Sequence, residues 1–379
     1  MKMKLYTSLI ITLLFPALVF SQNTVQEWFD KGVKLKSEKR AADAIIAFKE
    51  AVKIKSDYKE AWYEMGWCQN DVKDYGGAIL SLNKARSLWP GVPKLHFELA
   101  YAFEKTNKND SAVYHYNQVL QLKSDYASAY KQLGYVYYNK SDNENALNHF
   151  LKYEQTYKNP INDYLYWYRK GYVQNAVRQF EAAKISLNKS LELKSDYLNT
   201  YLELGFASAR LKQDEVAIEY YQKGIELDPK SHIPLNGIAE VYRDNKKDMN
   251  EAINWYKKTL ELNPDERKAN FGMGYCNNSL NNYTEAIPYL QKAIQKEPDY
   301  IAAYVELGYS QYKSGDNSSA LTSFNKALSL NPRNENARYY SALVYISENN
   351  KEMAQKIVDE LKTLNSRHAA TLQEKVSKL

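Results

Sequence analysis

The chain has 379 residues, of which 34 are tyrosine and only 14 are glycine, and its formal net charge is +6. An ordinary chain of this length forms two or three domains. Its charges are spread out with no long basic run, which argues against a nucleic-acid-binding protein.

The N-terminus predicts a secretory signal peptide. Lys2 and Lys4 give a basic start, an apolar run follows up to Phe20, and Val19 and Ser21 are small enough to precede a cleavage site. The run is short for a membrane span, and no later stretch is apolar enough to cross a membrane. No cysteine lies near the cleavage site, which excludes a lipoprotein anchor. We expect an exported protein of a Gram-negative bacterium, in the periplasm, associated with the outer membrane or secreted; an uncleaved anchor helix is the alternative.

After the signal peptide, one pattern recurs with a period of about 34 residues. The first repeat runs from about Val25 to Tyr58, the second to Val92 and the third to Tyr126. Each predicts two amphipathic helices joined by a turn, because apolar residues recur at helical spacing on both sides of a polar break. One such hairpin cannot bury its apolar face alone, so the hairpins are expected to stack.

The ninth repeat, residues 300–334, shows the pattern most clearly. Its first helix carries Tyr304, Leu307, Gly308 and Gln311, its second carries Ala320, Phe324 and Ala327, and Pro332 closes it. This pattern resembles the tetratricopeptide repeat, with W-x2-L-G-x2-Y, then A-x3-F, then P. The second repeat matches it almost position for position at Trp62, Met65, Gly66, Ala78, Leu82, Ala85 and Pro90. The resemblance implies an all-α, right-handed superhelical solenoid of about ten helix-turn-helix units.

The repeats are expected to form one solenoid over residues 22–365, between the signal peptide at 1–21 and a capping helix at 366–379. The frame slips by three residues around 158–161, where we expect a change in superhelical twist but no domain boundary. An extra residue is expected in a turn of the seventh repeat at 246–248. No sequence remains for a catalytic domain.

Candidate chemistry is sparse. The five histidines show no metal-binding motif, although His115 and His149 occupy the same position in adjacent repeats. Cys68 and Cys276 lie six repeats apart, too far for a disulfide in a linear stack. We therefore expect no cofactor, no metal and no enzymatic activity. The run Asp110-Ser111-Ala112 resembles an acceptor for O-linked glycan, but a three-residue match is weak and the cap of a second helix is the favoured explanation.

The family resemblance implies that the fifth, ninth and twelfth positions of each first helix face a concave groove. These positions are rich in aromatic residues, and we predict a binding surface from this set: Tyr63, Trp67, Phe97, Tyr101, Lys131, Tyr135, Tyr138, Tyr168, Tyr172, Phe206, Phe271, Tyr275, Tyr309 and Tyr312. Contiguous aromatic surface usually marks an interaction site. The alternative is that each ring only fills space against the next repeat.

The family also contains a clamp for C-terminal carboxylates, which needs a lysine at the fifth position and an asparagine at the ninth. Only Lys131 supplies the lysine, and Tyr135 stands where the asparagine would be. The sequence therefore favours a non-catalytic protein-protein interaction scaffold of the cell envelope that binds an extended peptide or a partner helix. The alternative function is binding of glycan or peptidoglycan, with tyrosines stacked on sugar rings. Neither the ligand nor the oligomeric state follows from the sequence.

We predict that the mature protein begins at Gln22, because Val19 and Ser21 suit the signal peptidase. The intact mass of the protein purified from an envelope fraction should lack residues 1–21. A mass that retains these residues would mean that the N-terminus stays as an anchor.

Overall fold

The computed structural model describes residues 11–379, and the side chains from residue 24 onward. The predicted signal peptide therefore lies outside the residues that are described in full. In the described part, the regular structure is entirely helical, which confirms the all-α class. No described helix is both long and apolar enough to span a bilayer.

The chain divides into two compact units, Met1–Asn162 and Asp163–Leu379. The first unit contains α1 (Ile11–Ser37), α2 (Ala41–Ile54), α3 (Lys59–Asp71), α4 (Tyr75–Leu88), α5 (Pro93–Lys105), α6 (Asn109–Leu122), α7 (Ala127–Asn139) and α8 (Asn143–Thr156). These helices form four hairpins, each a first helix followed by a second helix.

The structure corrects the expectation that Asp110 caps a second helix. Asp110 lies in the first turn of α6, whose N-cap is Lys108, so Asp110 is not the cap that the sequence suggested.

The second unit continues the pattern. It contains α9 (Tyr164–Ala176), α10 (Phe180–Leu193), α11 (Leu198–Arg210), α12 (Asp214–Leu227), α13 (Ile233–Glu240), the π-helix η1 (Val241–Lys246), α14 (Met249–Leu262), α15 (Arg267–Ser279), α16 (Tyr283–Lys296), α17 (Ile301–Lys313), α18 (Asn317–Leu330), α19 (Glu335–Ser347), α20 (Lys351–Thr363) and α21 (His368–Ser377). The boundary between the units falls directly after residues 158–161, where the repeat frame slips and no helix is formed.

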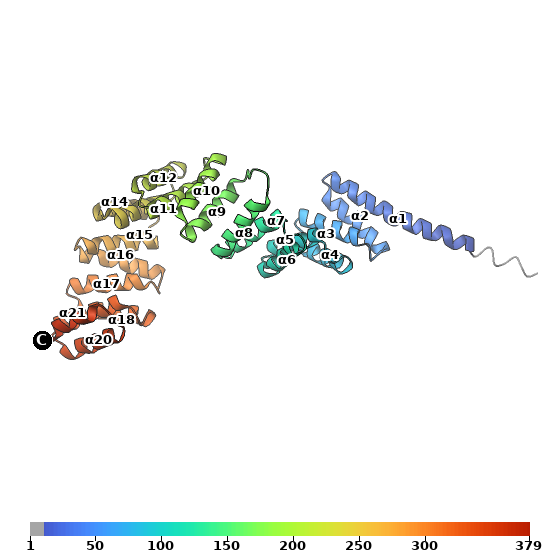
Figure 1. Cartoon of the computed structure of the whole chain (residues 1–379). Helices are drawn as coiled ribbons and strands as arrows, with labels where there is room; N and C mark the ends of the chain where they lie inside the picture. The colour runs from blue at the N-terminus through green and yellow to red at the C-terminus, as the bar shows by residue number, and fades with distance from the viewer. Residues whose placement is uncertain (1–10) are drawn as a thin grey trace, which may run out of the picture. The chain divides into compact units, whose positions relative to one another are not determined.

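Within each unit, consecutive helices lie side by side (Figure 1). Each first helix contacts its own second helix, and several first helices also contact the first helix of the following repeat, as α3 does α5 and α15 does α17. Contacts between neighbours only are the signature of a repeat solenoid. This arrangement places successive first helices along one side of each unit.

Alanine makes the hairpins close. The same position of every second helix is an alanine that is completely buried: Ala44, Ala78, Ala112, Ala146, Ala183, Ala217, Ala252, Ala286, Ala320 and Ala354. Because a methyl group is the largest side chain that fits between the two backbones there, the helices approach at a fixed distance. This is the strongest periodic signal in the sequence, and the structure confirms its role in the core.

A glycine on the first helix completes the contact. In the fourth repeat, a Cβ atom added to Gly134 would lie 2.4 Å from the ring of Phe150 on the second helix. Both residues, and Leu133 beside them, are buried, as the sequence predicted. The glycine therefore leaves the space that a large residue of the second helix fills, and this pairing recurs at Gly308 and Phe324.

The seventh repeat takes up its extra residue inside the first helix rather than in the turn at 246–248 where the sequence placed it. In regular repeats, the residue that caps the second helix donates its N–H to the carbonyl five residues earlier, as Asp316 does to Gln311. In the seventh repeat, the Asp248 N–H reaches back six residues to Tyr242. The π-helix η1 absorbs the additional residue and keeps the turn and the cap intact, and π-turns of this kind are frequent at functional sites.

The last helix covers the end of the stack. Leu372 and Val376 of α21 are buried in one cluster with Val358 and Leu361 of α20. This helix occupies the segment that the sequence assigned to a cap, and terminal repeats of solenoids need such a cap to cover their apolar face.

We predict that Gly134→Ala lowers the free energy of unfolding by roughly 1–3 kcal/mol, because the added methyl overpacks against Phe150. Gly76→Ala is the matched control, since a Cβ there meets no atom within 4 Å. The control should be neutral or stabilise by up to about 1 kcal/mol through helix propensity. Urea titrations of both variants measure the effect; equal behaviour would contradict the close-approach account.

Candidate functional site

The predicted groove residues at the fifth position are packing residues. Each ring lies against the ring that ends its own repeat, which closes the space between neighbouring first helices. The pairs and their ring-centroid distances are Phe97–Tyr126 (5.4 Å), Tyr168–Tyr197 (5.1 Å) and Phe271–Tyr300 (4.9 Å). Tyr63 packs in the same way against the cluster around Leu95. For these four rings, the space-filling alternative describes the geometry best.

The ninth-position rings are more accessible. Tyr172 and Phe206 expose 38% and 42% of their surface, and Trp67, Tyr101, Tyr135, Tyr275 and Tyr309 are half-buried. In three places the ninth-position ring meets a ring at the start of the preceding second helix edge to face: Tyr75–Tyr101 (6.2 Å), Phe180–Phe206 (6.1 Å) and Tyr283–Tyr309 (5.8 Å). Each of these ninth-position rings packs on a ring of the second helix and remains partly exposed.

The remaining predicted residues are half-buried. The Lys131 ammonium lies 5.6 Å from the ring of Tyr135 and 5.9 Å from that of Tyr153. Tyr138 is half-buried, and Tyr312 packs against the core of the last repeats. Lys131 is therefore placed among aromatic rings and not beside an asparagine.

A set of asparagine–glutamate pairs lies in the groove, and sequence reasoning missed it. Each asparagine ends a first helix and donates to the next first helix, from Nδ2 both to the glutamate backbone oxygen and to Oε2. The distances are 3.1 and 2.9 Å for Asn70–Glu98, 3.0 and 2.8 Å for Asn175–Glu203, and 3.1 and 2.8 Å for Asn278–Glu306. The pairs recur every third repeat, always beside one of the three edge-to-face ring pairs. Aligning the repeats position by position could have revealed them.

The three glutamates are half-buried carboxylates. Burial raises the pKa of Glu98, Glu203 and Glu306 above its ordinary value, and the hydrogen bond from the asparagine only partly offsets this. For Glu98 the charge of Lys36 also lowers the pKa. Glu203 and Glu306 form no ion pair with any described residue. The asparagine amide stabilises each negative charge by hydrogen bonding, without an ion pair. Burying a carboxylate in this way costs free energy, because the group loses part of its hydration.

A hollow in the groove of the second unit surrounds Glu203. This hollow of about 650 Å³, here called the Glu203 hollow, is lined by residues of α9 to α15, with Tyr172, Leu202, Phe206 and Ile233 as its apolar part. Its polar lining comprises Asn175, Glu203, Tyr221, Asn236 and Glu240, and three cationic residues, Arg178, Arg210 and Lys268. A smaller hollow of about 200 Å³ surrounds Glu98 in the first unit.

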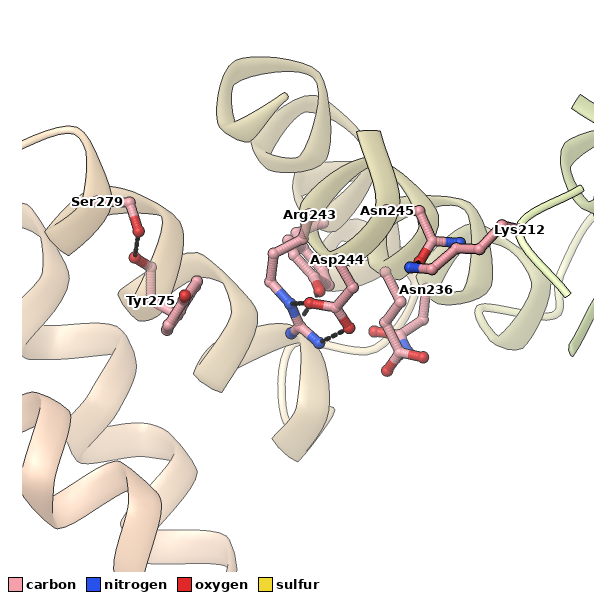
Figure 2. A network of polar contacts seen from close by, with 9 residues as sticks. Lys212, Asn236, Arg243, Asp244, Asn245, Tyr275 and Ser279 are labelled. Atoms are coloured by element: carbon pink, nitrogen blue, oxygen red, sulfur yellow. Dashed lines mark hydrogen bonds and ion pairs between the residues drawn. The ribbon is translucent and has the colours of Figure 1, made fainter. Parts of the chain in front are cut away.

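The π-helix lies next to this hollow in the sequence and builds a polar network (Figure 2). The Arg243 guanidinium donates to both carboxylate oxygens of Asp244, at 2.6 and 2.7 Å, and to the hydroxyl of Tyr256 at 2.8 Å. Burial alone would lower the pKa of Arg243, but these partners raise it, so the group stays charged. Asn245 donates to the Ala209 carbonyl oxygen at 2.8 Å and so ties the seventh repeat to the sixth.

The histidines are packed rings. Nδ1 of His115 lies 3.0 Å from Nδ1 of His96, and His149 stacks on Tyr137 at 5.4 Å. Burial lowers the pKa of His115 and of His149 to about 4, so both are neutral near pH 7. Among the described residues, no group of three or more candidate ligands could hold a metal ion.

Family models describing the tetratricopeptide repeat or TPR repeat match residues 105–141, 164–197, 198–231, 237–301 and 301–334. Together these segments cover more than half of the chain and fall on the helical hairpins described above. No model of a catalytic family is among these matches.

Two curated relatives are similar over short segments. The uncharacterized protein ycf37 of Cyanophora paradoxa is 31% identical over 116 residues, which is 31% of this chain and 63% of that protein. Anaphase-promoting complex subunit 3 of Schizosaccharomyces pombe is 22% identical over 113 residues, which is 30% of this chain and 17% of that protein. The chain thus spans less than two thirds of either relative.

Solved structures share the fold. PilF of Pseudomonas aeruginosa superposes with a TM-score of 0.50 at 17% identity, over 56% of this chain and 97% of that one. PilW, described as a type IV pilus biogenesis factor, gives 0.50 at 17% identity, over 55% and 98% of the two chains. At this level of identity, the likeness concerns the fold alone.

The three asparagines offer a test of the groove's polar contacts. The Oδ1 of Asn278 accepts from the Ser310 hydroxyl at 2.7 Å, whereas Oδ1 of Asn175 is buried without a partner, because Ala207 stands where Ser310 stands in the ninth repeat. We predict that Ser310→Ala costs about 1–3 kcal/mol by leaving the amide oxygen unpaired. The reciprocal Ala207→Ser should stabilise the chain by up to about 1 kcal/mol, since the new hydrogen bond exceeds the small loss of helix propensity. Denaturant titrations measure both; a destabilising Ala207→Ser would show that the two sites are not equivalent.

Proposed function

Because the chain is a tetratricopeptide-repeat protein, we propose that it is a non-catalytic scaffold that holds an extended peptide or a partner helix in the groove along its first helices. The single observation that carries this proposal is the Glu203 hollow, with two exposed rings beside half-buried polar groups. Apolar hollows with a few convergent polar groups are the usual sites of ligand binding.

The Tyr172 and Phe206 rings are suited to act as anchors. Each is a ninth-position ring on a first helix, and the Phe180 ring supports Phe206 at 6.1 Å. Rigid aromatic side chains in a concave surface bury much area on binding while losing little conformational entropy. A partner would therefore gain affinity here without a rearrangement of the repeat.

A second apolar surface competes with the groove. The second helices of the first three repeats expose one residue each at the same position, Ile46, Leu80 and Tyr114, and Ile185 repeats this in the fifth repeat. Leu80 and Ile185 expose 75% and 64% of their surface. Each of these repeats exposes one such side chain, and none of the four lines either of the two hollows described above. The groove is the better candidate because its rings converge on one space.

We also propose that this scaffold works in the bacterial cell envelope. The support is the N-terminal pattern of Lys2, Lys4 and the apolar run that ends near Ser21. In that compartment the two buried thiols need no special protection, because burial raises the pKa of both Cys68 and Cys276 to about 12 and keeps them protonated.

We predict that the double variant Tyr172→Ser/Phe206→Ser stays folded and loses its partner, because exposed hot-spot rings commonly contribute about 2 kcal/mol or more each to binding. Thermal melting and a quantitative pull-down from envelope extract on the same protein measure both effects. Leu133→Ala, in the buried core, is the stability control and should cost roughly 2–5 kcal/mol.

Ile185→Ser serves as the binding control on the second helices. If it loses the partner while the groove variant retains it, the binding surface lies on the second helices and the groove proposal is wrong. Retention of the wild-type protein on polysaccharide or sacculi, without any protein partner, would instead favour glycan binding.

A further inference from the structure

The floor of the Glu203 hollow is rich in hydrogen-bond acceptors and poor in donors. Asn175 spends both hydrogens of Nδ2 on Glu203, and Asn236 donates to Oε1 of Glu240 at 3.0 Å. The two amides are only 3% and 7% exposed, and their Oδ1 atoms have no hydrogen-bond partner. Because both Oδ1 atoms are fully buried, what remains for a ligand is the two carboxylates.

The Tyr221 hydroxyl lies close to both carboxylates. Its ring fits under Gly205 and Gly237, where an added Cβ would come within 2.7 and 2.5 Å of it. Burial raises the pKa of Tyr221, and the charges of Glu240 and Glu203 raise it further. The Tyr221 hydroxyl therefore stays protonated and neutral, and the negative charge of this floor comes from Glu203 and Glu240. Glu203, Tyr221 and Glu240 are here called the acidic floor.

The acidic floor has no ion-paired cation among the described residues. Neither Glu203 nor Glu240 forms an ion pair there, although three exposed cationic residues line the same hollow. The charge of Arg243 acts on Glu240, but the Arg243 guanidinium is itself paired with Asp244. Both carboxylates lose part of their hydration in this half-buried space. A cation supplied from outside would offset that cost, so the floor is complementary to a positive charge.

Within this chain, one lysine already binds to a carboxylate and an aromatic ring of the same kind. In the first two repeats, the Lys36 ammonium lies 2.5 Å from the Glu64 carboxylate and 3.9 Å from the centroid of the Trp67 ring. Trp67 holds the ninth position of its repeat, the position that Tyr172 and Phe206 hold at the Glu203 hollow. A carboxylate and a ninth-position ring therefore bind a basic side chain together in this fold.

Three cationic residues of the hollow, here called the rim, determine which residues can flank that basic side chain in a bound segment. Arg178, Arg210 and Lys268 are exposed and form no ion pair within the described residues, and Arg210 lies 5.8 Å from the ring of Phe180. A uniformly basic segment would meet these three charges and be repelled. A uniformly acidic segment would meet the acidic floor. Only a segment whose charge changes sign along its length complements both.

We propose that the Glu203 hollow binds an extended protein segment that inserts one arginine or lysine side chain against Glu203 and Glu240 and places acidic side chains against the rim. The proposal rests on the scaffold function and names the chemistry of the partner. The inserted side chain pairs with the acidic floor and lies beside the Tyr172 and Phe206 rings. Its acidic neighbours pair with Arg178, Arg210 and Lys268.

The test uses a dye-labelled synthetic peptide with a central arginine, a leucine on each side of it and a glutamate beyond each leucine. Its partner probe carries citrulline, the uncharged isostere of arginine. Fluorescence anisotropy with the full mature chain should show that citrulline weakens binding about tenfold or more, because close charge pairs across an interface couple by about 1.5 kcal/mol or more.

The decisive variant is Glu203→Gln, which keeps an oxygen to accept from Asn175 and removes only the charge. In this variant the difference between the arginine and citrulline peptides should shrink severalfold, because only the Glu240 carboxylate remains to pair with the arginine. Glu219→Gln, an exposed residue of α12 that does not line the hollow, should leave the difference unchanged. A melting curve of each variant establishes that it is folded.

Three outcomes overturn the proposal: no binding of the arginine peptide, equal binding of both peptides, or a citrulline effect that is undiminished in Glu203→Gln. Tighter binding of a peptide with a central glutamate and flanking arginines also overturns it, because the cationic rim would then contribute more to binding than the acidic floor. None of these outcomes touches the scaffold function, which is tested separately by loss of the native partner in the groove variant.

Discussion

Each repeat depends on one contact, in which a large side chain of the second helix fills the space left by a glycine or alanine of the first. Phe150 against Gly134 is typical, since no Cβ could stand between them. A buried alanine on the second helix, such as Ala146, allows the same approach from the other side. Because the contact recurs in nearly the same position, every hairpin has the same geometry, and its first helix faces the same side of the stack as its neighbours.

The groove follows from that regularity. First helices that face the same way bring their fifth, ninth and twelfth positions together along a surface that no single repeat contains. The two ring positions then play different roles. Fifth-position rings such as Phe271 close the joint with the ring of Tyr300, whereas ninth-position rings such as Phe206 stand beside a hollow. The fifth position thus packs between first helices, and our proposal assigns partner binding to the ninth position of the same helix.

The hairpins, the core alanines and the terminal helix could be predicted from the sequence, because each depends on local periodicity. The different surroundings of Phe271, at a fifth position, and Phe206, at a ninth position, could not, because they depend on contacts between helices: Phe271 packs on Tyr300, whereas Phe206 packs on Phe180 beside a hollow. The Asn175–Glu203 pair joins residues 28 positions apart and has no local signature. The extra residue of the seventh repeat was placed in the turn for a similar reason: the repeat pattern allows it in the helix or in the turn, and the π-helix that absorbs it involves contacts such as Arg243 with Tyr256 that have no local signature.

Polar groups that lack good partners mark where the chain departs from a purely structural stack. Most of the groove is satisfied internally, but the Glu203 hollow combines carboxylates without ion pairs and amide oxygens without donors among the described residues. Such groups cost stability, and a partner that pairs with the carboxylates would offset part of that cost. They lie within a single unit of the chain, so binding there requires no particular arrangement of the two units.

The most direct test of the groove is site-specific photo-crosslinking in living cells. A benzophenone amino acid is placed at Phe206, beside the Glu203 hollow, and in a second strain at Ile185, on the outer surface of α10. The account predicts a discrete crosslinked protein partner from position 206 and none from position 185. A partner captured only from position 185 would contradict it, because binding would then occur on the second helices.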